Sequence, residues 1–104
     1  MINLLKETED ALSAHKKTGK GVLWVGSTRE MWKISWRVFK KIANFDYDNG
    51  YGGNEIVSHL VVVGKDFWLE RWEYDGSEGW VYKTFPDEPK RTLRGALRGA
   101  LLEK

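Results

Sequence analysis

The chain has 104 residues and a net charge of +2, and this length is typical of a single compact domain. It contains no cysteine, which excludes disulfide scaffolds, thiol catalysis and cysteine-based zinc sites. No apolar run approaches the roughly 18 residues of a membrane span, and no secretory signal pattern is present, so we expect a cytoplasmic protein. The charge is uneven: residues 1–42 carry +5, residues 43–89 carry −7 and residues 90–104 carry +4.

The first predicted element is an amphipathic helix over residues 2–17. Its apolar stripe recurs at helical spacing and consists of Leu4, Leu5, Thr8, Ala11 and Leu12. Acidic residues lie toward its beginning and basic residues in its last turn, an order that complements the helix dipole. We expect Gly19 to close this helix, because glycine readily adopts the left-handed conformation that ends many helices.

The next segments predict one or two short strands and a second helix. Residues 21–27, GVLWVGS, form an apolar run between glycines that is typical of a buried strand. Residues 30–34 alternate like a strand but lead into helical spacing. We expect a short strand that ends near Ile34, and then a helix that has Ser35 as its N-cap and runs to about Asn44.

Residues 45–56, FDYDNGYGGNEI, have the composition of a binding loop. Neither calcium-loop frame fits, because a frame that starts at Asp46 puts valine at position 12 and one that starts at Asp48 puts histidine there. The stretch also lacks the residues of a phosphate-binding loop. We interpret it as a connector whose glycines allow positive φ. The alternative is a recognition loop in which Tyr47 and Tyr51 contact a partner.

Three strand-like runs follow, over residues 56–64, 67–74 and 79–85. Their short connectors predict a three-stranded antiparallel meander. For the second hairpin we favour a Gly76-Ser77 turn, because this register puts Glu70 opposite Lys83, whereas an Asp75-Gly76 turn would put two glutamates face to face.

The aromatic residues of these strands lie on both faces of the predicted sheet. Trp68, Trp72 and Tyr74 share one face because alternate residues of a strand point the same way. Either the helices pack on one face while loops and the tail half cover the other, or an aromatic patch stays exposed and meets a partner. In the second case the contact residues are these three, together with Tyr47 and Tyr51.

Residues 90–104 form a basic tail, for which the sequence predicts either a weak amphipathic helix or partial disorder. Basic residues in this tail and after the first helix would suit contacts with phosphates, so nucleic-acid association is the second hypothesis. Its candidate residues are Lys16, Lys17, Lys20, Arg91, Arg94 and Arg98. The aromatic strands lie in the acidic segment, which repels phosphates and favours a basic protein partner or a second copy of the chain.

The sequence contains no recognisable catalytic or metal-binding pattern. Ser58 and His59 are neighbours on a predicted strand, so their side chains point to opposite faces, and His15 lies on another element. The same alternation separates Glu70 from Glu73, which leaves no carboxylate pair for acid–base work. We therefore predict a protein that is not an enzyme and that uses no metal and no cofactor.

Residues 66–86, DFWLERWEYDGSEGWVYKTFP, resemble small uncharacterised proteins encoded in phages and prophages of Gram-positive bacteria. The preceding LVVVG strand (60–64) and YGGNEI segment (51–56) belong to the same resemblance, which covers roughly residues 22–88. It implies a phage or mobile-element origin and brings no catalytic residues.

These inferences predict one α+β domain over residues 1–89. Its elements would be an N-terminal helix, one or two short strands, a second helix and the antiparallel meander. A basic tail would follow at residues 90–104. The predicted function is that of an accessory protein that contacts other proteins through an acidic, aromatic-rich sheet.

Overall fold

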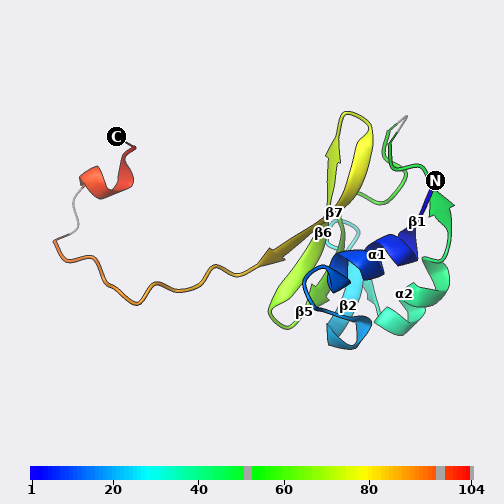
Figure 1. Cartoon of the computed structure of the whole chain (residues 1–104), viewed down its shortest axis with the longest axis horizontal. Helices are drawn as coiled ribbons and strands as arrows, with labels where there is room; N and C mark the ends of the chain where they lie inside the picture. The colour runs from blue at the N-terminus through cyan, green and yellow to red at the C-terminus, as the bar shows by residue number, and fades with distance from the viewer. Residues whose placement is uncertain (51–52, 96–97, 104) are drawn as a thin grey trace.

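The computed structural model describes residues 1–50, 53–95 and 98–103. Within these residues the chain forms two α-helices and two antiparallel sheets, so the predicted α+β class is confirmed. The elements in chain order are β1 (Ile2–Asn3), α1 (Leu4–Ser13), the 3₁₀ turn η1 (Gly19–Gly21), β2 (Val22–Ser27), β3 (Trp32–Ile34), α2 (Trp36–Ile42), β4 (Asp46–Tyr47), β5 (Leu60–Gly64), β6 (Phe67–Tyr74), β7 (Ser77–Thr84) and the 3₁₀ turn η2 (Arg98–Leu101) (Figure 1).

The main sheet has five strands in the order β3-β2-β5-β6-β7, and each pair of neighbours is antiparallel. Strands β5, β6 and β7 correspond to the three predicted runs, and β2 joins them by pairing with β5. The small pair β1–β4 ties the beginning of the chain to the segment after α2. The main sheet therefore has two edges, the three-residue strand β3 and the eight-residue strand β7.

Helix α1 is shorter than the predicted span because both of its ends are capped. Asn3 is the N-cap, and its side-chain oxygen accepts a hydrogen bond from the Lys6 backbone at 2.9 Å. At the other end Lys16, with φ of 60°, takes the left-handed position that the sequence assigns to Gly19. The Lys17 N–H donates a hydrogen bond to the Leu12 carbonyl, and the Lys16 N–H donates one to the Ser13 carbonyl. This is the pattern of a Schellman cap.

Helix α2 begins where the sequence predicts, because Ser35 is its N-cap. The hydroxyl of Ser35 accepts a hydrogen bond from the Val38 backbone at 3.1 Å. The helix ends at Ile42, and Phe39 buries its inner side against the sheet. The short strand β3 that precedes it pairs with the end of β2 and places Ile34 beside Val25.

The β6–β7 hairpin turns at Asp75 and Gly76, so the favoured Gly76-Ser77 register is wrong. Both turn residues have positive φ, 52° and 86°, as in a type I′ turn, whose twist matches that of the flanking strands. This register puts Glu73 opposite Glu78. These two facing glutamates were the reason for preferring the other register. The repulsion is avoided because the Glu78 side chain is buried and has its own cationic partner, whereas Glu73 is exposed.

The predicted faces of the hairpin survive this error. The two registers differ by two residues along β7, and an even shift leaves every side chain on its face. Glu70 is opposite Val81 rather than Lys83, yet the diagonal ion pair between Glu70 and Lys83 forms at 3.3 Å.

Both helices pack on the same face of the main sheet, which we call the inner face. Val25, Val62 and Leu69 point into this core and are buried. The Trp80 indole donates a hydrogen bond to the Thr8 hydroxyl of α1 at 2.9 Å. We call the opposite face of the sheet the outer face. No helix formed by the described residues covers it.

The tail leaves the domain at the end of β7 and runs away from it (Figure 1). Among its described residues, Arg98–Leu101 form the 3₁₀ turn η2, and residues 93–95 are not helical. The weak helix expected from the sequence is therefore not formed over these residues. Residues 96, 97 and 104 lie outside the described part of the chain.

Candidate interaction surface

The outer face is a continuous surface of aromatic and aliphatic side chains from four strands. Alternation along the paired strands places these residues on it: Trp24, Val61, Val63, Trp68, Glu70, Trp72, Tyr74, Val81 and Lys83. Trp24, Val63, Trp68 and Lys83 are aligned across the sheet as successive Cα partners. The surface therefore crosses the sheet as well as following β6.

Trp68 is held in place by its neighbours on this face. Its indole N–H donates a hydrogen bond to the Glu70 carboxylate at 2.7 Å, and its ring meets Phe85 edge-on with centroids 5.3 Å apart. The hydrogen bond from Trp68, together with the contact to Lys83, lowers the pKa of Glu70 from its ordinary value. The centre of the outer face is thus a fixed arrangement of rings around one ion pair.

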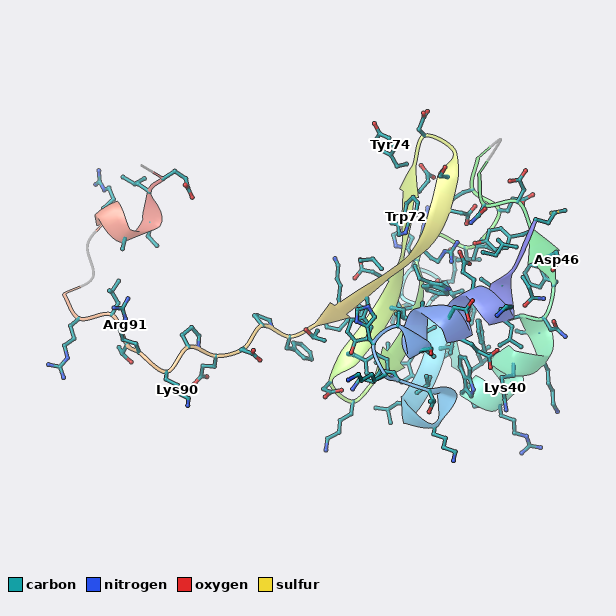
Figure 2. All side chains as sticks on the ribbon, viewed as in Figure 1. Lys40, Asp46, Trp72, Tyr74, Lys90 and Arg91 are labelled. Carbon is teal, nitrogen blue, oxygen red and sulfur yellow. The ribbon has the colours of Figure 1, made fainter. Side chains whose placement is uncertain are left out.

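Trp72 and Tyr74 carry the surface to the tip of the hairpin. Trp72 lies opposite Gly79, and its indole occupies the space that a side chain at Gly79 would fill. Tyr74 is 78% exposed, and Figure 2 shows its side chain projecting from the hairpin. Large exposed rings on a rigid hairpin are typical of protein contact surfaces.

A shallow hollow of about 520 Å³ lies beside Trp68 on the outer face. Its apolar lining comes from Trp24, Val61 and Val63, and its polar end comes from residues such as His59. Trp24 is not among the contact residues predicted from the sequence, because only the pairing of β2 with β5 brings this residue beside the meander. The available signal was its position in the predicted strand 21–27, where Trp24 and Val25 must point to opposite faces of the sheet.

Tyr47, one of the contact residues proposed from the sequence, is buried and held by hydrogen bonds. It is only 4% exposed, and its hydroxyl donates a hydrogen bond to Glu7 at 2.6 Å and accepts one from Arg71 at 2.9 Å. Burial and the hydrogen bond to Glu7 raise the pKa of Tyr47 to about 12. Tyr51, the second tyrosine of that proposal, lies outside the described residues.

Arg71 organises a buried polar cluster under the inner face. Its side chain is 2% exposed, pairs with Glu78 at 2.9 Å and Glu7 at 3.4 Å, and lies 4.7 Å from the centroid of the Trp80 ring. Two carboxylates and a tyrosine hydroxyl thus replace water at the terminal nitrogens of this guanidinium, while its buried Nε has no hydrogen-bond partner among the described residues. The cluster joins α1, β4, β6 and β7.

Glu78 also fixes the loop before β5. Its carboxylate accepts hydrogen bonds from the backbone N–H groups of Glu55 at 2.7 Å and Ile56 at 3.2 Å. Its own backbone N–H donates to the Asn49 carbonyl at 2.9 Å. The described part of the 45–56 segment is therefore a connector anchored to the hairpin.

Most of the carboxylates of the acidic segment lie away from the outer face. Of the ten Asp and Glu residues between positions 43 and 89, Glu70 is the one that the described strands place there, and it is paired. Four others gather around the hairpin tip and the loop that Glu78 anchors, and no described Lys or Arg pairs with them. We call Asp48, Glu55, Glu73 and Asp75 the acidic end.

The basic candidates divide into two groups with different surroundings. Lys17 is engaged by Asp66 at 3.6 Å and by the Phe67 ring at 5.1 Å, while Lys16 and Lys20 are exposed. The tail residues Arg91, Arg94 and Arg98 are exposed as well, and Figure 2 shows Arg91 far from the domain. The tail is thus free to reach a partner.

In the part of the chain that the structure describes, no group of three or more His, Asp or Glu side chains is placed to hold a metal ion. No helix formed by these residues combines the length and the apolar character of a membrane span. Comparisons with protein families, with curated proteins and with solved structures find no match to this chain.

Proposed function

We propose that this chain is a non-enzymatic accessory protein that acts by binding another protein through its outer face. The observation that carries the proposal is the placement of both helices on the inner face, which leaves Trp24, Trp68 and Trp72 on a side without a helical cover. A small domain gains stability by burying such rings, so a sheet face that leaves Trp72 exposed and Trp24 and Trp68 only half-buried suits a contact surface.

The outer face is preorganised for binding. Glu70 and Phe85 fix Trp68, and Gly79 fixes Trp72, so few side-chain rotamers remain to be lost on association. The acidic end lies next to Trp72 and Tyr74, which favours a partner that offers apolar residues with a basic rim. A basic protein of the bacterial host would have this character.

The resemblance of residues 66–86 to phage and prophage proteins supports a mobile-element origin. On that basis we place the protein in the cytoplasm of a Gram-positive host cell. A phage accessory protein of this kind would act on a host or phage protein that it meets there.

The proposal is tested by affinity capture from a lysate of the host. The Tyr74→Ala variant removes the most exposed ring of the outer face without touching the core, and Trp72→Ala removes the neighbouring ring on β6. Ile42→Ala is the matched control, because Ile42 is an exposed apolar residue on α2. A partner that is captured by the wild type and the control, and lost with both outer-face variants, supports the proposal; capture that is equal for all four proteins refutes it.

Association with nucleic acid is the second candidate function. It is favoured by the exposure of Arg91, Arg94 and Arg98, none of which forms an ion pair among the described residues. It predicts binding to DNA or RNA that weakens steeply with salt and is lost on truncation after Pro89. Fluorescence anisotropy with a labelled oligonucleotide measures both, and the absence of salt-dependent binding to DNA or RNA would eliminate this candidate.

A further inference from the structure

Strand β7 is an edge strand whose outward backbone groups are free over half its length. In a two-residue hairpin the residues that flank the turn, here Tyr74 and Ser77, are hydrogen-bonded to each other. The backbone N–H and C=O groups of Glu78, and of every second residue after it, therefore point away from β6. The bond from the Glu78 N–H to the Asn49 carbonyl confirms this direction. The N–H and C=O groups of Trp80, Tyr82 and Thr84 face the same way, and no described residue bonds to them.

The free edge has a defined beginning and end. Asn49 occupies it at Glu78, and Pro86, which has no N–H, ends it two residues after Thr84. A second strand that runs antiparallel to β7 can form hydrogen bonds with all three free residues only if three of its own residues face β7. The middle one of those three must then lie opposite Tyr82. In this register Trp80 pairs with the last of the three facing residues of the second strand, and Thr84 pairs with the first.

The charges at the two ends of this edge are opposite. The acidic end lies beside the beginning of β7, because Glu73 is opposite Glu78 and Glu78 holds the Asp48–Glu55 loop. The basic tail, which carries +4 over residues 90–104, leaves from the other end of β7. Within one chain these two regions are therefore kept apart by the length of the strand.

We propose that β7 pairs antiparallel with β7 of a second copy, and that each tail reaches the acidic end of the other copy. A two-fold axis at Tyr82 pairs Tyr82 with itself and Trp80 with Thr84 of the second copy, and it forms six backbone hydrogen bonds. The antiparallel direction brings the end of one β7 beside the beginning of the other. The basic tail of each copy therefore lies beside the acidic end of the other copy, whereas within one chain the tail and the acidic end lie at opposite ends of β7.

The length of the tail is sufficient for this contact. From Gly79 to the turn at Asp75 an extended strand covers about 13 Å, whereas residues 85–91 of the second copy span up to about 23 Å. Arg91 and Arg94 of one copy then lie within reach of Glu73 and Asp75 of the other. The joined sheet has ten strands, and its outer faces remain open for the partner of the proposed function.

The test is sedimentation equilibrium of the full chain with edge and charge variants. Thr84→Pro removes an outward N–H while leaving the bonds to β6, and Thr84→Ala is its matched control because it keeps that N–H. We expect a wild-type dimer, unchanged association for Thr84→Ala, and association weakened about tenfold or more for Thr84→Pro, which removes two hydrogen bonds per dimer.

The charge part of the proposal has its own variants. Glu73→Lys and the double change Arg91→Glu/Arg94→Glu should each weaken the dimer at low salt, and the three changes combined in one chain should restore it. A wild-type chain that stays monomeric at the highest soluble concentration overturns the proposal. So does a dimer that is unaffected by Thr84→Pro, because its interface must then lie elsewhere.

Hydrogen exchange of the wild type gives an independent readout that needs no variant. The amides of Trp80, Tyr82 and Thr84 should become protected as the protein concentration rises, while those of Asp75 and Gly76 in the turn should not. Protection that is independent of concentration at all three amides contradicts strand pairing between copies.

Discussion

Arg71 and Glu78 form an ion pair of 2.9 Å across the β6–β7 hairpin, and both side chains are almost completely buried. The two residues are not Cα partners, since Arg71 is opposite Trp80 and Glu78 is opposite Glu73. The pair is therefore diagonal on the inner face, and it explains how the hairpin accepts two glutamates in facing positions.

Removal of Glu78 should destabilise the protein strongly. Glu78→Ala leaves the buried guanidinium of Arg71 with one carboxylate and frees the backbone of Glu55 and Ile56, so we expect a loss of about 3–5 kcal/mol. Urea unfolding followed by tryptophan fluorescence measures this loss. Glu73→Ala is the control, with an expected effect within about 0.5 kcal/mol because Glu73 is exposed. Equal losses for the two variants would contradict the role assigned to the buried pair.

Tyr47 should make the stability of the fold fall at alkaline pH. The folded state raises the pKa of this phenol from 10.0 to about 12, so its contribution is complete below pH 10 and is lost as the pH rises toward 12. The difference in unfolding free energy between wild type and Tyr47→Phe, measured by urea unfolding, should therefore decrease over this interval. A difference that stays constant from pH 9 to pH 12 would show that Tyr47 titrates like an exposed tyrosine.

Glu70 should titrate below its ordinary range because of Trp68. The pKa of this carboxyl is lowered from 4.5, so the stabilisation that it provides is present above that pH and is lost as the pH falls through the folded-state value. Trp68→Phe keeps a ring but removes the N–H donor, and it should move the pKa of Glu70 upward. Carbon-detected NMR titration of the Glu70 carboxyl gives both values, and identical midpoints in the two proteins would rule out control by Trp68.

Lys16 is a site where glycine should stabilise the protein. Its φ of 60° is unfavourable for a residue with a Cβ, and glycine relieves this strain, for an expected gain of about 0.5–1 kcal/mol in Lys16→Gly. Lys16→Ala removes the same long side chain but keeps the Cβ, so it should stay near the wild type. Thermal unfolding by circular dichroism compares the two, and equal midpoints would mean that the cap is not strained.

Local patterns predicted much of the secondary structure. Ser35 was identified as an N-cap because its hydroxyl acts on a backbone group three residues away. The extent of β6 follows from its alternation and from the glycines around it. Trp68, Trp72 and Tyr74 were assigned to one face for the same reason, since strand alternation does not depend on which element packs above the strand.

The errors concern residues whose position depends on distant partners. Tyr47 reads as a loop tyrosine, but Glu7 and Arg71, 40 and 24 residues away, bury it. The hairpin register was mispredicted because facing charges were weighed without the buried partner of Glu78. Trp24 was missed because no local signal states that β2 pairs with β5.

Spacing along the chain is enough to predict the α+β class, the cap of α2 and the side of β6 on which its tryptophans lie. Contacts between distant segments set which face the helices cover, which carboxylates are buried and which edge of the sheet stays free. Those properties arise when segments far apart in sequence meet, and burial then selects among arrangements that local propensity leaves nearly equal in energy.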